Sequence, residues 1–154
     1  MSPSRRTQIL GAADHATLRD MLALFGKAFE DPEQYGARPP GDDYLRKLLE
    51  RDSFVAIAAF KGPRLVGGLA GYVLPKFEQE RSEFYIYDLA VDAAHRRCGV
   101  ATALIQELQR LARRRGIGCI FVQADLGDDP AIALYSRLGR REDVLHFDIA
   151  PADA

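Results

Sequence analysis

The stretch from Asp88 to Ile105, DLAVDAAHRRCGVATALI, constrains the fold of this 154-residue chain more than any other. Its apolar residues Leu89–Val91 are typical of a strand, a short basic loop follows, and a helix is expected to begin near Val100. Backbone N–H groups in the first turn of a helix have no partner within the helix, so they can bind an anion in front of it. This succession of strand, loop and helix start therefore predicts a binding site for a phosphorylated ligand.

Two common phosphate-binding motifs are absent from the chain. Gly99 is not followed by the further glycines of GxGxxG, and no Gly-Lys-Ser/Thr sequence occurs. What remains is Arg96-x-x-Gly99-x-Ala101, at the start of a helix whose apolar residues include Leu104 and Leu108 at helical spacing. This pattern resembles the pyrophosphate loop of the GNAT superfamily of N-acetyltransferases, which use acetyl-CoA.

The composition favours a single folded domain that spans residues 1–154, because 47% of the residues are hydrophobic and 28% are charged. A formal net charge of −1 gives no basic field that would attract nucleic acid. No apolar run reaches the roughly 20 residues of a membrane span, and the N-terminus lacks the apolar core of a secretory signal. Two cysteines, Cys98 and Cys119, and three scattered histidines have no metal-ligand spacing. We therefore expect a cytoplasmic protein with no metal and no membrane or nucleic-acid partner.

Hydrophobic periodicity and turn residues predict the element order β-α-α-β-β-β-α-β-α-β. The expected strands are Thr7–Leu10, Phe54–Phe60, Leu65–Leu74, Glu83–Val91, Ile117–Ala124 and Val144–Ile149. The expected helices are one capped by Asp14 that carries Leu18–Phe29, one with Tyr44–Leu49, one from Val100 to a stop at Gly116, and one from Asp128 to Leu138, with a loop at Glu30–Asp43. The order predicts an α/β protein with a mixed sheet and helices on its faces. It also resembles the GNAT fold, whose twisted central sheet is mostly antiparallel.

A second piece of the resemblance lies in DDPAIALYSRLG, from Asp128 to Gly139. GNAT proteins often carry Asn-x-x-Ala-x-x-x-Tyr-x-x-x-Gly there, and Ala131 and Tyr135 fall on this pattern. Asp128 stands where Asn is usual, and Arg140 replaces the usual aromatic residue after Gly139. These departures lead us to expect a specialised acceptor end.

A closer resemblance spans nearly the whole chain. Three stretches, YVLPKFEQERSEFYIYDLAV at Tyr72–Val91, QADLGDDPAIALY at Gln123–Tyr135 and the ending His146–Ile149, are similar to the aminoglycoside 3-N-acetyltransferases of the gentamicin-resistance class. The resemblance implies acetyl transfer from acetyl-CoA to the 3-amino group of an aminoglycoside through a ternary complex, and antibiotic resistance. Two alternatives stay open: a GNAT enzyme for another small amine or a protein terminus, and a non-catalytic CoA-binding module.

The resemblance also implies which residues hold the cofactor. Backbone N–H groups at the helix start would face the pyrophosphate, and the preceding strand would pair with the amide-bearing pantetheine arm by strand addition. The expected cofactor-binding residues are Leu89, Ala90, Val91, Arg96, Arg97, Cys98, Gly99, Val100, Ala101, Thr102, Asp128, Ala131 and Tyr135.

Acetyl transfer to an amine needs a general base for the amine and a general acid for the departing thiolate. At the family's tyrosine position, Tyr135 is the expected acid. Glu83 and Asp88, on the strand that leads into the loop, are both candidates for the base, and the sequence leaves the choice open. Strand alternation puts Glu83 with Tyr85 and Tyr87 on one face and Asp88 on the other, unless a bulge intervenes. An ion pair between Glu83 and Arg81 is the structural alternative.

Acidic residues gather in the loops, while basic residues gather on the helix that follows Gly99. An acidic mouth would attract a polycationic aminosugar, so we expect this class of small molecule as the substrate. A homodimer is one open expectation for the assembly. The expected substrate-binding residues are Tyr35, Phe77, Glu78, Glu83, Asp125, Asp129 and Glu142, with Asp125, Asp128 and Asp129 also rival bases.

Overall fold

The computed structural model describes residues 4–153. Contacts divide the chain into two units, Met1–Gln123 and Ala124–Ala154. The first unit holds the whole sheet and all helices except the last. Among the described residues, no helix has the length and apolar character that crossing a membrane requires.

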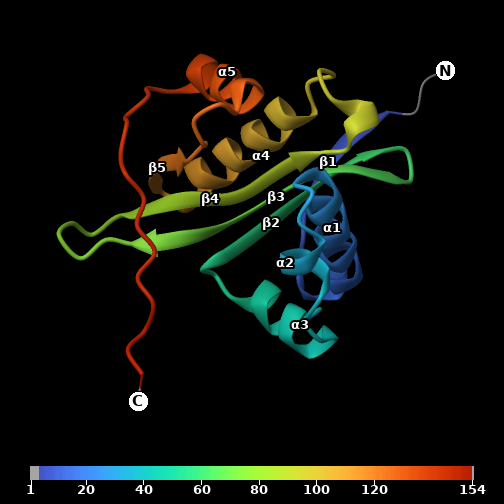
Figure 1. Ribbon diagram of the computed structural model, residues 1–154, viewed down its shortest axis with the longest axis horizontal. Coiled ribbons are helices and arrows are strands. Elements are labelled where there is room, and N and C mark those ends of the chain that lie inside the picture. The colour runs from blue at the N-terminus through green and yellow to red at the C-terminus, as the bar shows by residue number, and fades with distance from the viewer. Residues whose placement is uncertain (1–3, 154) are drawn as a thin grey trace. The chain divides into compact units, whose positions relative to one another are not determined.

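The first unit is built on a five-stranded sheet in which neighbours in sequence are neighbours in space (Figure 1). Its strands are β1 (Arg5–Ile9), β2 (Phe54–Lys61), β3 (Arg64–Pro75), β4 (Ser82–Val91) and β5 (Ile117–Val122). The first three pairs are antiparallel, and β5 pairs with β4 in parallel. The prediction of a mixed, mostly antiparallel sheet is therefore confirmed, and five of the six predicted strands form within two residues of their expected ends.

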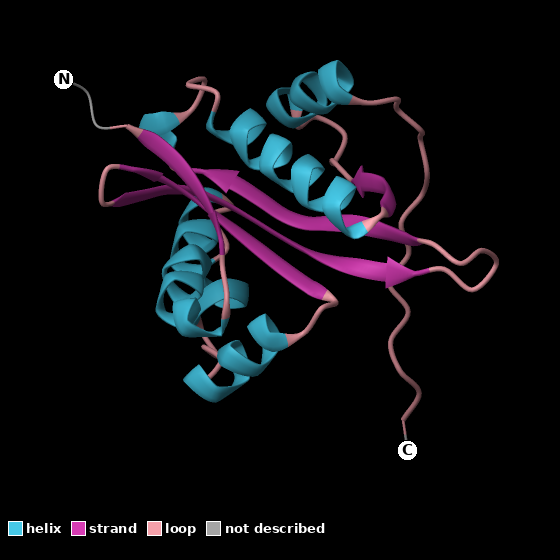
Figure 2. Cartoon of the chain, turned by 180° about the vertical axis from the view of Figure 1, so that it is seen from behind, coloured by secondary structure: helices cyan, strands magenta, loops and turns pink. Residues whose placement is uncertain are grey.

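Helices lie on both faces of this sheet (Figures 1 and 2). One face carries α1 (His15–Ala28), α2 (Pro32–Gly36) and α3 (Asp42–Glu50), and the other carries α4 (Val100–Arg115). Two adjacent glycines of β3 show the alternation, because a side chain at Gly68 would meet Met21 of α1, whereas one at Gly67 would meet Val100 of α4. Two short 3-10 helices, Ala12–Asp14 and Ala93–His95, precede α1 and α4.

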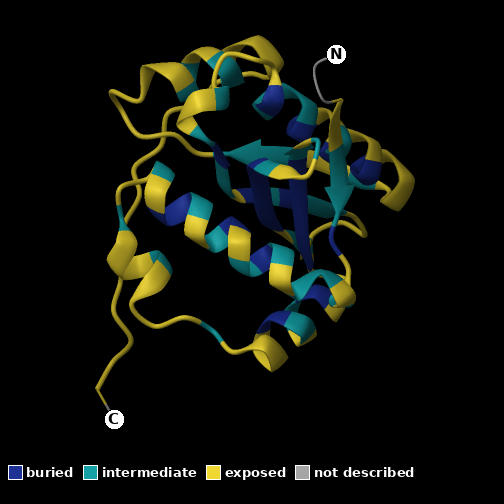
Figure 3. Ribbon diagram, turned by 90° about the vertical axis from the view of Figure 1, so that its right-hand side faces the viewer, coloured by how far each residue is buried: buried dark blue, intermediate teal, exposed yellow. Residues whose placement is uncertain are grey.

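Each face buries its own apolar core, and Figure 3 shows the buried residues concentrated on the central strands. On the α1 face, Met21 and Phe25 of α1 pack with Leu45 of α3 over small strand residues. On the α4 face, the buried positions of the helix recur every three or four residues, at Val100, Leu104, Leu108 and Leu111. Because both sides of the sheet are buried, β4 keeps its position between its neighbours. The start of the loop that follows Val91 is positioned in the same way.

Strand β4 contains a bulge in the middle of its pairing with β3. Ala70 lies opposite Asp88 and Gly71 lies opposite Ile86, so Tyr87 is the extra residue. The backbones come very close here, since a Cβ at Gly71 would lie 2.2 Å from the carbonyl oxygen of Tyr85. Only glycine permits this approach, and the bulge turns the rest of β4 by one residue relative to its first half.

Two local predictions on the α1 face need correction. Asp14 precedes α1, but its side chain does not cap that helix and instead accepts a hydrogen bond from the Gly11 N–H at 2.8 Å. The segment Glu30–Asp43, predicted as a loop, contains α2, because Asp31 accepts from the Gln34 N–H at 3.2 Å and Pro32 occupies the first helical turn.

The second unit contains α5 (Asp129–Leu138), capped by Asp128, whose carboxylate accepts a hydrogen bond from the Ala131 N–H at 3.4 Å. The strand predicted at Val144–Ile149 does not form, and that prediction is wrong within the described residues. The apolar side chains of this segment are largely exposed, and its backbone makes no ladder with another described strand (Figure 2). Strand conformation depends on a hydrogen-bonding neighbour, so an apolar run does not create a strand by itself.

Candidate active site

The loop before α4 has the backbone geometry expected for an anion site. Gly99 is the residue before the helix and has φ of 77°, and Arg97 has φ of 60°, so two left-handed residues flank Cys98. Ala103 donates the first helical hydrogen bond, to the Gly99 carbonyl at 3.0 Å. The N–H groups of Val100 to Thr102 precede that bond and have no acceptor within the helix. This loop therefore fits the phosphate site predicted from the sequence.

Arginine side chains surround the loop, and one of them was missed in the sequence. The guanidinium of Arg5, on β1, donates a hydrogen bond to the carbonyl oxygen of Cys98, from 93 residues away in the chain. Arg96 donates from Nε to the carbonyl oxygen of Val91 at 3.3 Å. No local pattern around Arg5 distinguishes it from Arg6, because its position depends on where β1 joins the sheet. The loop thus carries three guanidinium groups, from Arg5, Arg96 and Arg97.

The strand that leads into this loop has one free edge. Pairing between β4 and β5 ends where Ile86 lies opposite Val122, whereas pairing with β3 continues to Val91 opposite Gly67. Along Leu89, Ala90 and Val91, no described strand pairs with the β5 side of β4. The backbone groups of this edge are available to an extended, amide-bearing ligand.

The bulge decides the relation between the two carboxylates proposed as bases. Asp88 lies opposite Ala70 and Glu83 opposite Leu74, so both side chains belong to the face that also carries Tyr72. Simple alternation had put them on opposite faces. That expectation is corrected because Tyr87 is an extra residue between them.

Asp88 lies half-buried at the point where β4 leaves β5. The Tyr35 hydroxyl, on α2, donates a hydrogen bond to Asp88 Oδ1 at 2.8 Å. Burial raises the pKa of the Asp88 carboxyl, and the Tyr35 hydrogen bond offsets part of that rise. The Tyr35 ring packs beside Phe25 and Phe29, with ring centroids 6.2 and 5.6 Å away. Tyr35, expected as a cover for sugar rings, therefore supports the Asp88 carboxylate.

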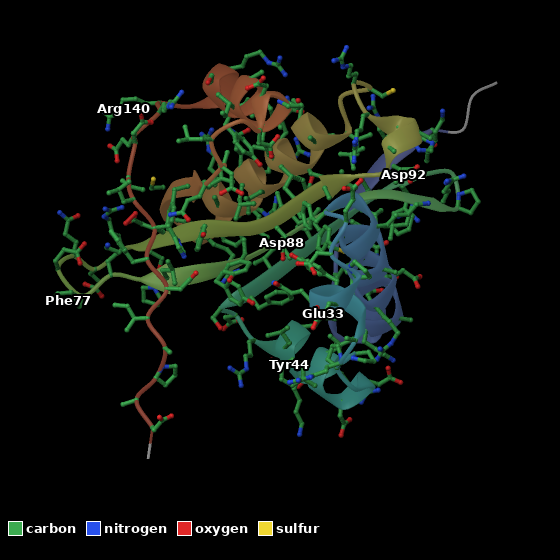
Figure 4. All side chains as sticks on the ribbon, in the orientation of Figure 1. Glu33, Tyr44, Phe77, Asp88, Asp92 and Arg140 are labelled. Atoms are coloured by element: carbon green, nitrogen blue, oxygen red, sulfur yellow. The ribbon has the colours of Figure 1, made fainter. Side chains whose placement is uncertain are left out.

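Glu83 has a different environment, near the hairpin that joins β3 to β4. Its carboxylate lies 3.2 Å from Lys76 Nζ and 3.7 Å from Arg81 Nη2, so the ion pair considered as the alternative is present. Glu78 also contacts Lys76, at 3.2 Å, and Phe77 is fully exposed. Figure 4 shows Phe77 at the tip of this hairpin and Asp88 in the middle of the sheet. The structure thus separates the hairpin residues from Asp88.

The remaining predicted site residues belong to the second unit. Burial raises the pKa of Tyr135 to about 12, and the nearby carboxylate of Asp128 also raises it. A phenol with this pKa keeps its proton at neutral pH, as a general acid must. Asp125 and Asp129 are exposed, and Glu142 forms an ion pair with Arg140 at 3.2 Å.

Comparisons with known proteins give a family match and similar solved structures. Residues 18–139 match the acetyltransferase (GNAT) family model. A crystal structure of an aminoglycoside acetyltransferase from an uncultured soil metagenomic sample is 54% identical, with 97% of this chain and 99% of that chain covered and a TM-score of 0.94. A second aminoglycoside acetyltransferase from such a sample, in complex with sisomicin, is 31% identical, with 96% and 97% covered and a TM-score of 0.88.

A curated relative matches over a shorter region. The streptothricin acetyltransferase of Streptomyces lavendulae is 30% identical over 87 residues, which are 56% of this chain and 43% of that protein. The chain therefore aligns with less than half the length of this relative.

Proposed function

Because the chain belongs to the GNAT family of acetyltransferases, whose members use acetyl-CoA, we propose that it acetylates an amino group of aminoglycosides. The finer proposal is the 3-amino group of gentamicin-class compounds, with resistance as the consequence. The observation that carries the proposal is the 54% identity, over 97% of the chain, to an aminoglycoside acetyltransferase. The half-buried Asp88 beside the free edge of β4 supplies a matching chemical group.

Acetyl-CoA would bind to backbone groups of the first unit. When bound, it would supply the acetyl group as an activated thioester. The N–H groups at the start of α4, with the guanidinium groups of Arg5, Arg96 and Arg97, fit its pyrophosphate. The edge at Leu89–Val91 fits the amides of its pantetheine arm, and an N–H group of this edge can polarise a carbonyl oxygen.

We assign the general base to Asp88. Its carboxylate would accept a proton from the substrate ammonium, directly or through water, and burial brings its pKa closer to neutral pH than that of an ordinary carboxyl. Glu83 is already paired with Lys76 and Arg81, which occupy its Oε1 atom. Asp88 is therefore the better base of the two.

We assign the general acid to Tyr135, whose hydroxyl holds the proton that a departing thiolate needs. Asp128 and Ala131, at the start of the same helix, keep their proposed place in the cofactor site. The acids Glu78, Asp125, Asp129 and Glu142, together with Phe77, stay proposals as outer contacts of a cationic substrate. Tyr35 is proposed to position Asp88.

The function is tested by measuring CoA release with purified protein, acetyl-CoA and a panel of amines. The panel contains gentamicin, sisomicin, streptothricin, spermidine and a peptide with a free N-terminus. We expect turnover with gentamicin and sisomicin, and NMR of the product should locate the acetyl group on the 3-amino nitrogen. Turnover with streptothricin alone would favour the activity of the curated relative instead.

A second measurement separates an enzyme from a CoA-binding module. Tyr135→Phe should lower the rate at least about tenfold and leave the dissociation constant of CoA unchanged, because only proton transfer is affected. Cofactor binding without turnover of any amine in the wild-type protein would contradict the proposed function.

A further inference from the structure

Aromatic residues occupy a row of paired positions across four strands of the sheet. Phe54 of β2 pairs with Tyr72 of β3, Tyr72 pairs with Tyr85 of β4, and Tyr85 pairs with Phe121 of β5. The ring centroids are 5.5 Å apart for Phe54 and Tyr72 and 4.7 Å apart for Tyr85 and Phe121, which are stacked. Cross-strand neighbours at these positions stabilise one another, so the row is a fixed part of the sheet.

The bulge adds a fifth ring to this row. Tyr87, the extra residue of β4, lies 5.8 Å from Tyr72 and 5.5 Å from Tyr85, between the two rings. Tyr72 and Tyr87 are 38% and 58% exposed, so their faces are not used by the core. We name Phe54, Tyr72, Tyr85, Tyr87 and Phe121 the aromatic row. Its centre is an exposed aromatic surface on the same face of the sheet as Asp88.

A hydrogen bond holds this surface in place, and the Asp88 carboxylate lies near it. The Tyr85 hydroxyl donates to Gln123 Oε1 at 2.9 Å, which fixes its ring. Burial raises the pKa of Tyr72, and the nearby hydroxyl of Tyr44 and the Asp88 carboxylate raise it further. Figure 4 shows Tyr44 of α3 and Glu33 of α2 on the same side of the sheet as Asp88. Both residues are exposed, so this side of the sheet carries polar and acidic groups in addition to Asp88.

This combination selects for a particular kind of ligand. Aromatic faces bind apolar C–H surfaces and attract cations, and ammonium groups are held more strongly over tyrosine when water is partly excluded. A polycationic aminosugar presents both C–H faces and ammonium groups, whereas an anion would be repelled by Asp88. A flexible polyamine has no flat face to cover the rings.

We propose that the aromatic row is the platform on which a non-reacting ring of the aminosugar lies, so that its neighbouring amino group reaches Asp88. This inference rests on the proposed function and specifies which side chains recognise its substrate. Tyr87 is the central residue of the platform. Because the bulge turns both Tyr87 and Asp88 toward this face, the same backbone feature positions the platform and the base.

The test compares Tyr87→Leu with Tyr87→Phe. Leucine keeps apolar volume but removes the ring, whereas phenylalanine keeps the ring and removes only the hydroxyl. We expect the dissociation constant of sisomicin, measured by calorimetry, to rise about tenfold in Tyr87→Leu and less than about twofold in Tyr87→Phe. In steady-state assays the loss should appear in KM rather than kcat, and the dissociation constant of CoA should not change.

The outcomes separate this inference from the proposed function. If the wild-type protein neither binds nor acetylates sisomicin or gentamicin, the proposed function fails and the platform fails with it. If the wild-type protein acetylates sisomicin and Tyr87→Leu binds it equally well, the platform alone is overturned. An equal loss in both variants would assign recognition to the hydroxyl and would also overturn it. Thermal unfolding of both variants verifies that they fold, as expected for a residue that is 58% exposed.

Discussion

Beyond the bulge, strand β4 offers backbone groups along its free edge and side chains on its α1 face. The cofactor edge, Leu89–Val91 with the loop to Thr102, is continuous in sequence and uses N–H and C=O groups that any residue carries. The acceptor face combines Asp88, Tyr35 and the aromatic row, which come from five different elements. A site of backbone groups depends on φ and on the helix start, whereas a site of side chains depends on residue identity. The two sites should therefore fail under different substitutions.

The largest expected effect is on the acceptor face. Asp88→Asn keeps the shape of the side chain and its contact with Tyr35 but removes the proton acceptor. We expect kcat to fall by at least about a hundredfold, because the proton acceptor is lost, and the dissociation constant of CoA to stay unchanged, because the substitution leaves the groups of the cofactor edge in place.

Glu83→Gln is the matched control, since it removes the other carboxylate on the same face of β4. Its charge is paired with Lys76 and Arg81 in the hairpin, so we expect less than about a twofold change in kcat. A larger loss in Glu83→Gln than in Asp88→Asn would reverse the assignment of the base.

CoA binding at the cofactor edge should depend on backbone conformation rather than on the identity of side chains. Gly99→Ala puts a Cβ on a residue with φ of 77°, which costs about 1 kcal/mol and moves the N–H groups that begin α4. We expect the dissociation constant of CoA, measured by calorimetry, to rise about tenfold. Cys98→Ala, at the neighbouring exposed residue, should change it less than about twofold, because it keeps the backbone groups of the loop and removes only the weak Sγ hydrogen bond to the Arg96 carbonyl oxygen. Equal losses in the two variants would contradict a backbone-built site.

The difference between a site of backbone groups and a site of side chains also decides how much of each site the sequence predicts. The strand, the loop and the helix start of the cofactor edge form as predicted, since they leave local patterns within eighteen consecutive residues. Their role in binding the cofactor stays a prediction. The bulge at Tyr87 leaves no local pattern in the sequence, because it depends on the close approach of Gly71 from the neighbouring strand. Alternation without a bulge would have put Asp88 on the face opposite Glu83, and the bulge puts both on one face. The role of Asp88 as the base stays a prediction.

Two further residues show the limit of local patterns. Tyr35 was predicted only as a cover for a sugar ring, which stays a prediction, and no local pattern indicated that its hydroxyl reaches Asp88, 53 residues away in the chain. The run Val144–Ile149 has the composition of a strand and was predicted as one, yet it has no partner among the described residues. In each case the missing information is the neighbour, which pairing across the fold supplies and sequence spacing does not.

Arg5 contributes a side chain to the cofactor edge from a distant element, β1. It therefore tests how far this edge depends on side chains as well as on backbone groups. Arg5→Gln removes the cationic donor to the Cys98 carbonyl oxygen. We expect the dissociation constant of CoA to rise about threefold, and its dependence on salt concentration to weaken.

Arg6→Gln is the matched control for Arg5→Gln. The guanidinium of Arg6 lies over the Phe60 ring, 4.3 Å from its centroid, and hydrogen-bonds to Gln8, so it does not contact the loop. We expect CoA binding to be unchanged in this variant. Equal losses in the two arginine variants would mean that net charge, rather than the contact with Cys98, supports the loop.

The smallest expected effect concerns the pH dependence of the acceptor face. Burial raises the pKa of Asp88, and the Tyr35 hydrogen bond lowers it because that bond stabilises the carboxylate. The base acts as a carboxylate, so kcat/KM should rise with pH as Asp88 loses its proton. In Tyr35→Phe the stabilising bond is lost and the pKa of Asp88 rises further, which moves this acid limb to higher pH. Above the limb, where Asp88 is ionised in both proteins, the rates should approach each other. A limb that stays in place in a folded Tyr35→Phe variant would mean that Asp88 is not the group that titrates, and the base would then have to be sought among the acids outside the bulge.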